Sequence, residues 1–194
     1  AGSKSAYGRS KAEGEAAVRA AFPSATILRP SIVFGREDQF VNRFAGLISS
    51  LPIVPIIGGK ARFQPVYVDD VAEAVKLSLS DPARFGGRTF ELGGPETISM
   101  AELNKRIAKE IGEDPSFIDM PDSLSGLMAG LTGWLPGAPI TRDQWAMLSR
   151  DNVVAPRMPG LADLGVVPTP LDAVAAGWLD IYRRHGRFAG KAAA

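Results

Sequence analysis

Residues 5–35 of the chain read SAYGRSKAEGEAAVRAAFPSATILRPSIVFG, a helix-forming segment followed by a short apolar one. Residues 5–22 are rich in Ala, Glu, Arg and Lys, which favour a helix, and Pro23 and Ser24 end it. Residues 25–30 are apolar, contain β-branched side chains and end at a proline, a pattern that predicts a buried strand. A helix followed directly by such a strand is typical of a layered α/β fold.

The alternation of helices and strands continues downstream. Apolar residues at helical spacing over residues 40–51 predict an amphipathic helix, and Glu37 and Asp38 precede it, where a helix N-terminus favours acids. Residues 51–65 contain three prolines and a Gly-Gly pair and predict a long loop with short extended pieces. Further strands are expected at residues 66–68, 89–92 and 117–120, and further helices at residues 69–79 and 99–112. The sequence thus predicts an α/β fold with a parallel sheet.

The composition of the chain changes after residue 121. Residues 124–135 are apolar and glycine-rich without Lys or Arg, and they predict a lid over a substrate pocket or, as the alternative, an interaction face for a partner or a membrane surface. A capping box predicts a helix start at residue 141, and Thr169 and Pro170 predict the start of a terminal helix that ends near residue 186.

The composition excludes several classes of protein. The 194 residues contain 22 basic and 21 acidic side chains, no Cys and one His, which argues against zinc ribbons, iron–sulfur ligation and a Ser-His-Asp triad. Residues 1–62 hold nine basic and four acidic groups, an excess that suits a phosphate-bearing ligand but is too scattered for nucleic acid. We expect a reducing, cytoplasmic setting, with a peripheral position at a membrane as the alternative.

The residues most informative about chemistry are Tyr7 and Lys11 in the sequence YGRSK. Residues four apart share one face of a helix. A lysine ammonium one turn from a tyrosine phenol stabilises the phenolate by Coulomb attraction, which a phenolic acid or base needs near neutral pH. The simpler alternative is an exposed tyrosine and lysine on an alanine-rich helix.

Other charged residues have structural explanations. Asp69 is expected as a helix N-cap and Asp70 as an acid of the first turn, rather than as a catalytic pair. His185 lies where a cation complements a helix C-terminus.

The ordered segments YGRSKAEGE, ILRPSIVFG, FQPVYVDDVAEAV and TFELGGPE resemble the extended and atypical short-chain dehydrogenases/reductases, the NAD-dependent epimerase/dehydratase superfamily. They look closest to the branch that contains the nucleotide-binding accessory subunit of respiratory complex I and its bacterial relatives. The resemblance implies a partial Rossmann-like parallel sheet with flanking helices in residues 1–121. It implies a mainly helical substrate-side or lid region in residues 122–194.

The resemblance also implies roles for individual residues. Tyr7 would be the catalytic acid/base, and Lys11 would assist it and bind the nicotinamide ribose. The backbone after the first strand would face the nicotinamide, and further residues would line the substrate side, although Arg62 and Gln64 are equally well explained as solvated loop residues. The cofactor-facing residues are Pro30, Ser31, Ile32 and Val33, and the substrate-side residues are Arg36, Arg62, Phe63 and Gln64.

The glycine-rich phosphate turn of this superfamily has no match in the sequence, nor has its active-site serine. The chain therefore resembles the C-terminal portion of such a protein, with NAD or NADP bound fully only by the intact protein. We expect an NAD(P)-dependent oxidoreductase or epimerase-like enzyme acting on a small molecule. The alternatives are a non-catalytic NAD(P)H-binding subunit of a complex I type assembly and a pure interaction module. Expected partners are the missing N-terminal part and either a respiratory complex or another copy of the chain.

Overall fold

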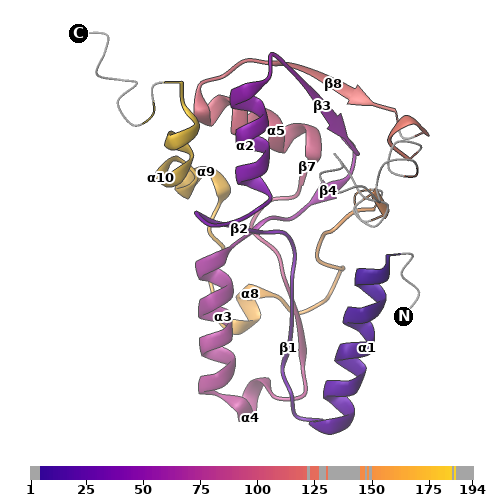
Figure 1. The fold of residues 1–194 in the computed structure, drawn as a ribbon. Coiled ribbons are helices and arrows are strands. Elements are labelled where there is room, and N and C mark those ends of the chain that lie inside the picture. The colour runs from indigo at the N-terminus through magenta and orange to yellow at the C-terminus, as the bar shows by residue number, and fades with distance from the viewer. Residues whose placement is uncertain are drawn as a thin grey trace.

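The computed structural model describes residues 5–121, 123–126, 130, 145–146, 148, 150–184 and 186. Helices and strands alternate along this part of the chain (Figure 1). Their order and bounds are α1 (Ala6–Ala21), β1 (Ile27–Pro30), β2 (Val33–Phe34), α2 (Val41–Ser50), β3 (Ile53–Ile57), β4 (Arg62–Phe63), β5 (Val66–Tyr67), α3 (Val68–Ser80), α4 (Pro82–Phe85), β6 (Thr89–Leu92), β7 (Ile98–Ser99), α5 (Met100–Ile111), β8 (Ser116–Met120), α8 (Leu161–Leu164), α9 (Leu171–Val174), α10 (Ala176–Leu179) and the 3-10 helix η1 (Asp180–Tyr182).

The strands form short pairs, most of them parallel. β1 runs parallel to β6, β2 to β5, and β3 to β8, while β4 and β7 are antiparallel. Figure 1 shows α1 and α3 on either side of the β1–β6 pair, and α2 and α5 beside β3 at the other end of the molecule. Parallel strands joined through helices confirm the α/β class.

Two large apolar clusters correspond to these two ends. The first joins α2 and α5 to the terminal helices, where Leu171 and Trp178 are buried. The second joins β5, β6 and α3 to α8, where Leu161 and Leu164 are buried. Segments from both sides of residue 121 thus contribute to each cluster, and the division of the chain at that residue stays a prediction.

Serine side chains cap two of the predicted helices. The Ser5 hydroxyl accepts a hydrogen bond from the Gly8 amide at 3.2 Å and begins α1. The Ser99 hydroxyl accepts one from the Glu102 amide at 3.1 Å and begins α5. Gly112, with φ at 74°, ends α5 in the left-handed conformation that glycine adopts without strain.

Residues 51–65, predicted as a long loop with short extended pieces, contain two such pieces, the five-residue strand β3 and the two-residue strand β4. Pro55 lies in the middle of β3, opposite Ile118 of β8. A proline cannot donate to a ladder, but β3 has a single strand partner among the described residues and so has a free edge that accommodates it.

The start of α3 and the C-terminal helix differ from prediction. α3 begins at Val68 with Tyr67 as its N-cap, so Asp69 lies in the first turn and does not cap it. The terminal region forms α9, α10 and η1 instead of one regular helix, and Pro170, not Thr169, is the N-cap of α9. Thr169 bonds to Asp70 instead: the buried Asp70 carboxylate accepts hydrogen bonds from the Thr169 amide and hydroxyl, at 2.7 and 2.8 Å.

Several predictions fall outside the described residues. They concern most of the apolar segment 124–135, of which only residues 124–126 and 130 are described, the helix start at 141, and His185. None of the helices in the described part of the chain combines the length and hydrophobicity that crossing a lipid bilayer requires.

Candidate functional site

Tyr7 and Lys11 lie on neighbouring turns of α1, as the sequence predicts. The Lys11 Nζ is 5.4 Å from the centroid of the Tyr7 ring. The Tyr7 side chain is about half exposed, and its ring lines a cavity together with Ser5 and Gly8 of the same turn. The pair therefore presents an ammonium beside a phenol at the edge of a cavity.

α1 is attached to the β1–β6 pair mainly through polar contacts, because none of its residues is buried. The Arg29 guanidinium on β1 donates two hydrogen bonds to the Glu15 carboxylate, at 2.8 and 2.7 Å, and it also contacts Glu91 on β6. This pairing holds the pKa of Glu15 below its usual value. Arg19 donates a hydrogen bond to Thr89. The helix that carries Tyr7 is thus held by ion pairs and hydrogen bonds.

The chain runs from Pro30, the last residue of β1, through Ser31 to Ile32 and Val33 in the cavity wall. The Ser31 amide donates to the Leu92 carbonyl at 2.9 Å, and the Ser31 hydroxyl donates to the Asn152 carbonyl at 3.0 Å. The Ile32 carbonyl accepts from the Val66 amide, and Ile32 and Val33 line the same cavity as Tyr7. Pro30 ends β1 and is exposed.

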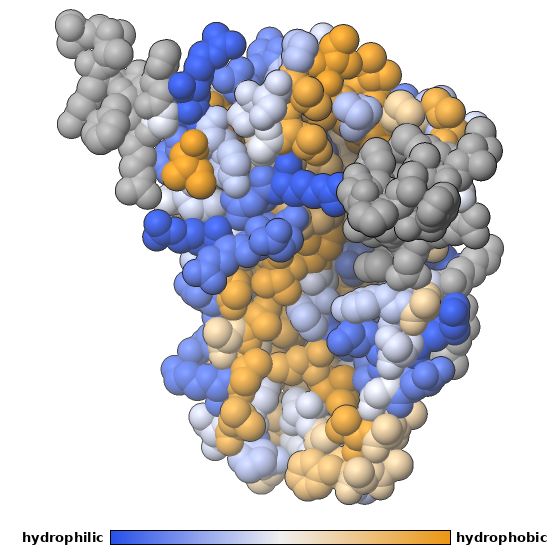
Figure 2. Space-filling view, viewed as in Figure 1, coloured by the Kyte–Doolittle hydropathy of each residue, from blue (hydrophilic) through white to orange (hydrophobic). Residues whose placement is uncertain are grey.

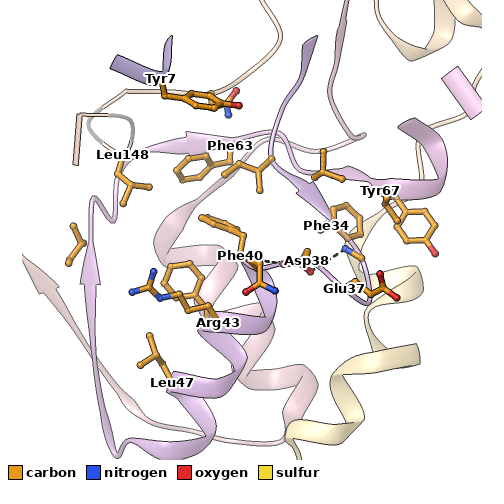
Figure 3. Close-up of a pocket in the computed structure, with 18 of the residues that line it drawn as sticks. Tyr7, Phe34, Glu37, Asp38, Phe40, Arg43, Leu47, Phe63, Tyr67 and Leu148 are labelled. Carbon is orange, nitrogen blue, oxygen red and sulfur yellow. Dashed lines mark hydrogen bonds between the residues drawn. The ribbon is translucent and has the colours of Figure 1, made fainter. Parts of the chain in front are cut away.

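The cavity has a volume of about 1290 Å³, larger than the several hundred Å³ usual for small-ligand sites. Figure 3 shows Phe63, Phe40 and Leu47 below the Tyr7 ring, with Leu148 to one side and Glu37 and Tyr67 to the other. One part of the cavity wall is therefore aromatic and aliphatic, and another part carries polar groups.

The polar wall is built on Asp38. Its carboxylate accepts from the amides of Phe40 at 2.7 Å, Val41 at 2.5 Å and Gly35 at 3.2 Å. The Asn42 side-chain amide donates to the carbonyls of residues 35, 36 and 38. Asp38 thus satisfies amides at the start of α2, which confirms that an acid precedes this helix, and it fixes the loop that lines the cavity.

Tyr67 and Asp69 form a second polar contact at this wall. A hydrogen bond between the Tyr67 phenol and the Asp69 carboxylate raises the pKa of Tyr67 above its usual value. Both residues line the cavity.

The four predicted substrate-side residues are distributed over two environments. Arg36 and Phe63 line the cavity. The Arg62 guanidinium donates two hydrogen bonds to the Asp151 carboxylate, and this ion pair lowers the pKa of Asp151. Gln64 donates to the Gly94 carbonyl at 2.8 Å and accepts from the Val154 amide at 3.0 Å. The Arg62 and Gln64 side chains therefore bind the segment after residue 150.

A diphosphate-binding turn is not found within the described part of the chain. The Gly93-Gly94 pair follows β6 but packs against protein: a Cβ on Gly93 would lie 2.5 Å from the Gln64 side chain, and one on Gly94 would overlap the Pro65 carbonyl oxygen. The described glycine pairs therefore offer no turn for a diphosphate. No group of three or more metal-ligating side chains occurs among the described residues.

Sequence reasoning missed several cavity residues. Phe40, Phe44 and Leu47 were recognised only as the apolar stripe of a helix, and Leu148 and Asn152 had no signal at all. A stripe at helical spacing predicts burial but not whether it packs against protein or lines a cavity. Only the position of α2 beside β3 and Phe63 distinguishes these outcomes.

Comparison with known proteins identifies the family of the chain. A family model described as "RmlD substrate binding domain" matches residues 2–127. The chain is 38% identical over 184 residues to "NADH dehydrogenase [ubiquinone] 1 alpha subcomplex subunit 9, mitochondrial" of Mus musculus, covering 91% of this chain and 46% of the relative. It is 30% identical over 179 residues to "NADH-ubiquinone oxidoreductase 40 kDa subunit, mitochondrial" of Neurospora crassa, covering 92% and 47%. The chain thus spans about half the length of the curated relatives it matches.

A solved structure shares the fold. UDP-glucose 4-epimerase from Bifidobacterium longum, solved in complex with NAD+ and UDP, superposes with a TM-score of 0.60 at 19% identity, covering 92% of this chain and 55% of that one. The family model, which matches well over half of the chain, leads to one assignment: the chain belongs to the RmlD substrate binding domain family.

Proposed function

We propose that the chain is the proton-transferring, substrate-side half of an NAD(P)-dependent oxidoreductase or epimerase. The observation that carries this proposal is the Tyr7–Lys11 pair, with the ammonium 5.4 Å from the ring centroid and the phenol ring at the edge of a large cavity. The ammonium lies over the face of the phenol ring, and a phenol at a cavity wall is within reach of a bound substrate.

In this proposal Tyr7 passes a proton to or from a substrate oxygen, and Lys11 stabilises the phenolate and hydrogen-bonds the nicotinamide ribose. A bound nicotinamide supplies or accepts the hydride. Pro30, Ser31, Ile32 and Val33 present backbone groups to the nicotinamide. Arg36 and Phe63 contact the substrate directly, while Arg62 and Gln64 hold the segment after residue 150 in place beside it.

The diphosphate of the cofactor would bind to the remaining part of the longer protein. The relatives are about twice as long as this chain, and the Gly93-Gly94 pair after β6 is packed against Gln64 and Pro65. We therefore propose that NAD or NADP binds fully only when an N-terminal part of the same protein pairs with the free edge of β1.

The test uses the full-length protein and the absorbance of reduced nicotinamide as the readout of turnover. Tyr7→Phe should lower kcat by a factor of about 100 or more, because general acid–base catalysis contributes on the order of 10² to 10⁴. Lys11→Met should also lower it. Tyr182→Phe and Lys105→Met, on η1 and α5 and outside the cavity, are the matched controls and should leave turnover unchanged.

Unchanged turnover in Tyr7→Phe would refute the catalytic assignment. The initial substrate panel should include sugar nucleotides, since the neighbouring solved epimerase was crystallised with UDP and NAD+.

A second candidate is a non-catalytic NAD(P)H-binding subunit of a respiratory complex, and the names of the curated relatives favour it. This candidate predicts tight cofactor binding without absorbance change on any substrate. It also predicts that the protein co-purifies with a membrane-bound NADH dehydrogenase. Turnover that depends on Tyr7 would exclude it as the sole function.

A further inference from the structure

One arm of the cavity lacks the polar groups that a sugar or a nucleotide requires. We define the apolar arm as Phe40, Phe44, Leu47 and Leu51 of α2 and its C-cap, Pro55 and Ile57 of β3, together with Phe63 and Leu148. All eight line the cavity, and none carries a hydrogen-bonding side chain. Among the residues of α2 that line the cavity, Arg43 is the only one with a polar side chain.

The arm is continuous with the position of Tyr7. The ring centroids of Phe63 and Phe40 are 6.0 Å apart, and those of Phe40 and Phe44 are 5.2 Å apart. Leu47 and Leu51 continue the same face of the helix, at spacings of three and four residues. From Phe40 to Leu51 the helix rises about 16 Å, a length that an extended alkyl chain of medium length spans.

Part of the arm remains exposed to solvent. Leu47 and Leu51 are 38% and 41% exposed although they line the cavity, whereas the aromatic part of the arm packs against the small cluster of Ile56, Ala61, Phe63 and Met100. Apolar surface of this kind gains most from an apolar ligand. Sugar hydroxyls placed there would lose their hydrogen bonds to water without replacement.

The remainder of the cavity wall carries polar groups. Asp38 and Asp69 are engaged by backbone amides and by Tyr67. Arg36 and Arg150 line the cavity, and neither forms an ion pair with another described residue. Tyr7 and Asn152 thus border the cavity outside the arm, whereas Asp38 bonds the amide of Phe40 and Arg43 lies on the arm itself.

We propose that the substrate is an amphiphile, a molecule with a hydroxyl or carbonyl at Tyr7 and a single hydrocarbon chain in the apolar arm. This inference rests on the proposed function for the role of Tyr7, but binding of the chain does not require turnover.

The experiment measures binding of 2-alkanones of increasing chain length to the protein by calorimetry. A fully buried methylene strengthens binding by about threefold to fourfold, so affinity should rise by roughly that factor per added carbon until the arm is filled. Leu47→Gln and, separately, Leu51→Gln should flatten this dependence while leaving the shortest ketone bound as before. Leu79→Gln, an exposed leucine on α3 outside the cavity, is the matched control and should keep the wild-type dependence.

Two results would overturn the inference. One is an affinity independent of chain length. The other is binding of UDP-glucose that Leu47→Gln and Leu51→Gln weaken, which would put a sugar nucleotide in the arm. Failure of the proposed function is distinguishable, since chain-length-dependent binding together with turnover insensitive to Tyr7→Phe would preserve this inference and refute the catalytic role.

Discussion

Replacing Asp38 by alanine tests whether one carboxylate organises the cavity wall. In the wild type its two oxygens accept from the amides of Gly35, Phe40, Val41 and, at 3.4 Å, Asn42. The substitution removes these acceptors at once. The amides of Phe40 and Val41 lie closest to the carboxylate, so the loss of their hydrogen-bond acceptor costs the most stability.

The magnitude follows from the number and kind of these bonds. Loss of a helix cap costs about 0.5–2 kcal/mol, and a hydrogen bond to a charged group contributes about 1.5–3 kcal/mol. Water replaces part of the loss because Asp38 is only half-buried. We therefore expect Asp38→Ala to lower the free energy of unfolding by about 2–3 kcal/mol. Asp38→Asn keeps one acceptor oxygen, and we expect it to cost about 1 kcal/mol.

The assay is urea unfolding followed by circular dichroism. Glu37→Ala is the matched control, because this neighbouring carboxylate is exposed and accepts no hydrogen bond from the part of the chain that the structure describes. It should change stability by less than about 0.5 kcal/mol. The reasoning would be refuted if Asp38→Ala and Glu37→Ala lowered the free energy of unfolding equally while the slope of that free energy against urea concentration stayed unchanged.

Two further perturbations test the attachment of other elements. Because Arg29 lowers the pKa of Glu15, the pair stabilises the fold fully above the usual pKa of glutamate, about 4.3, and this stabilisation is lost as pH falls through the lowered value. Glu15→Gln should therefore reduce stability at neutral pH by less than about 1 kcal/mol and make the loss below pH 5 less steep in acid unfolding curves. Asp70→Ala leaves the Thr169 amide and hydroxyl without their acceptor and should cost about 2–3 kcal/mol in urea unfolding. Thr169→Val removes only the hydroxyl bond and should cost about 1 kcal/mol, so equal losses in these two variants would contradict the assignment of both bonds to Asp70.

The sequence by itself determined the elements whose signals are local. These elements are the serine caps at Ser5 and Ser99, the glycine end at Gly112 and the apolar stripe of α2. Each depends on residues within a few positions of one another, so the stabilising interactions can be inferred from the sequence alone. The Tyr7–Lys11 spacing belongs to the same class, because one helical turn brings the two side chains together.

Tertiary structure decided everything that joins distant segments. β3 exists as a strand because β8, about sixty residues later, supplies the backbone partners that residues 53–57 lack locally. Arg62 and Gln64 are bound by residues near 150, and Asp70 by Thr169, pairings that sequence spacing cannot specify. The cavity itself lies where α2, β3 and the loop after β1 meet the first turn of α1. Figure 2 shows the surface of the molecule from the same side as Figure 1. The physical reason is that a local pattern fixes which face of an element is apolar, whereas only packing decides what that face meets.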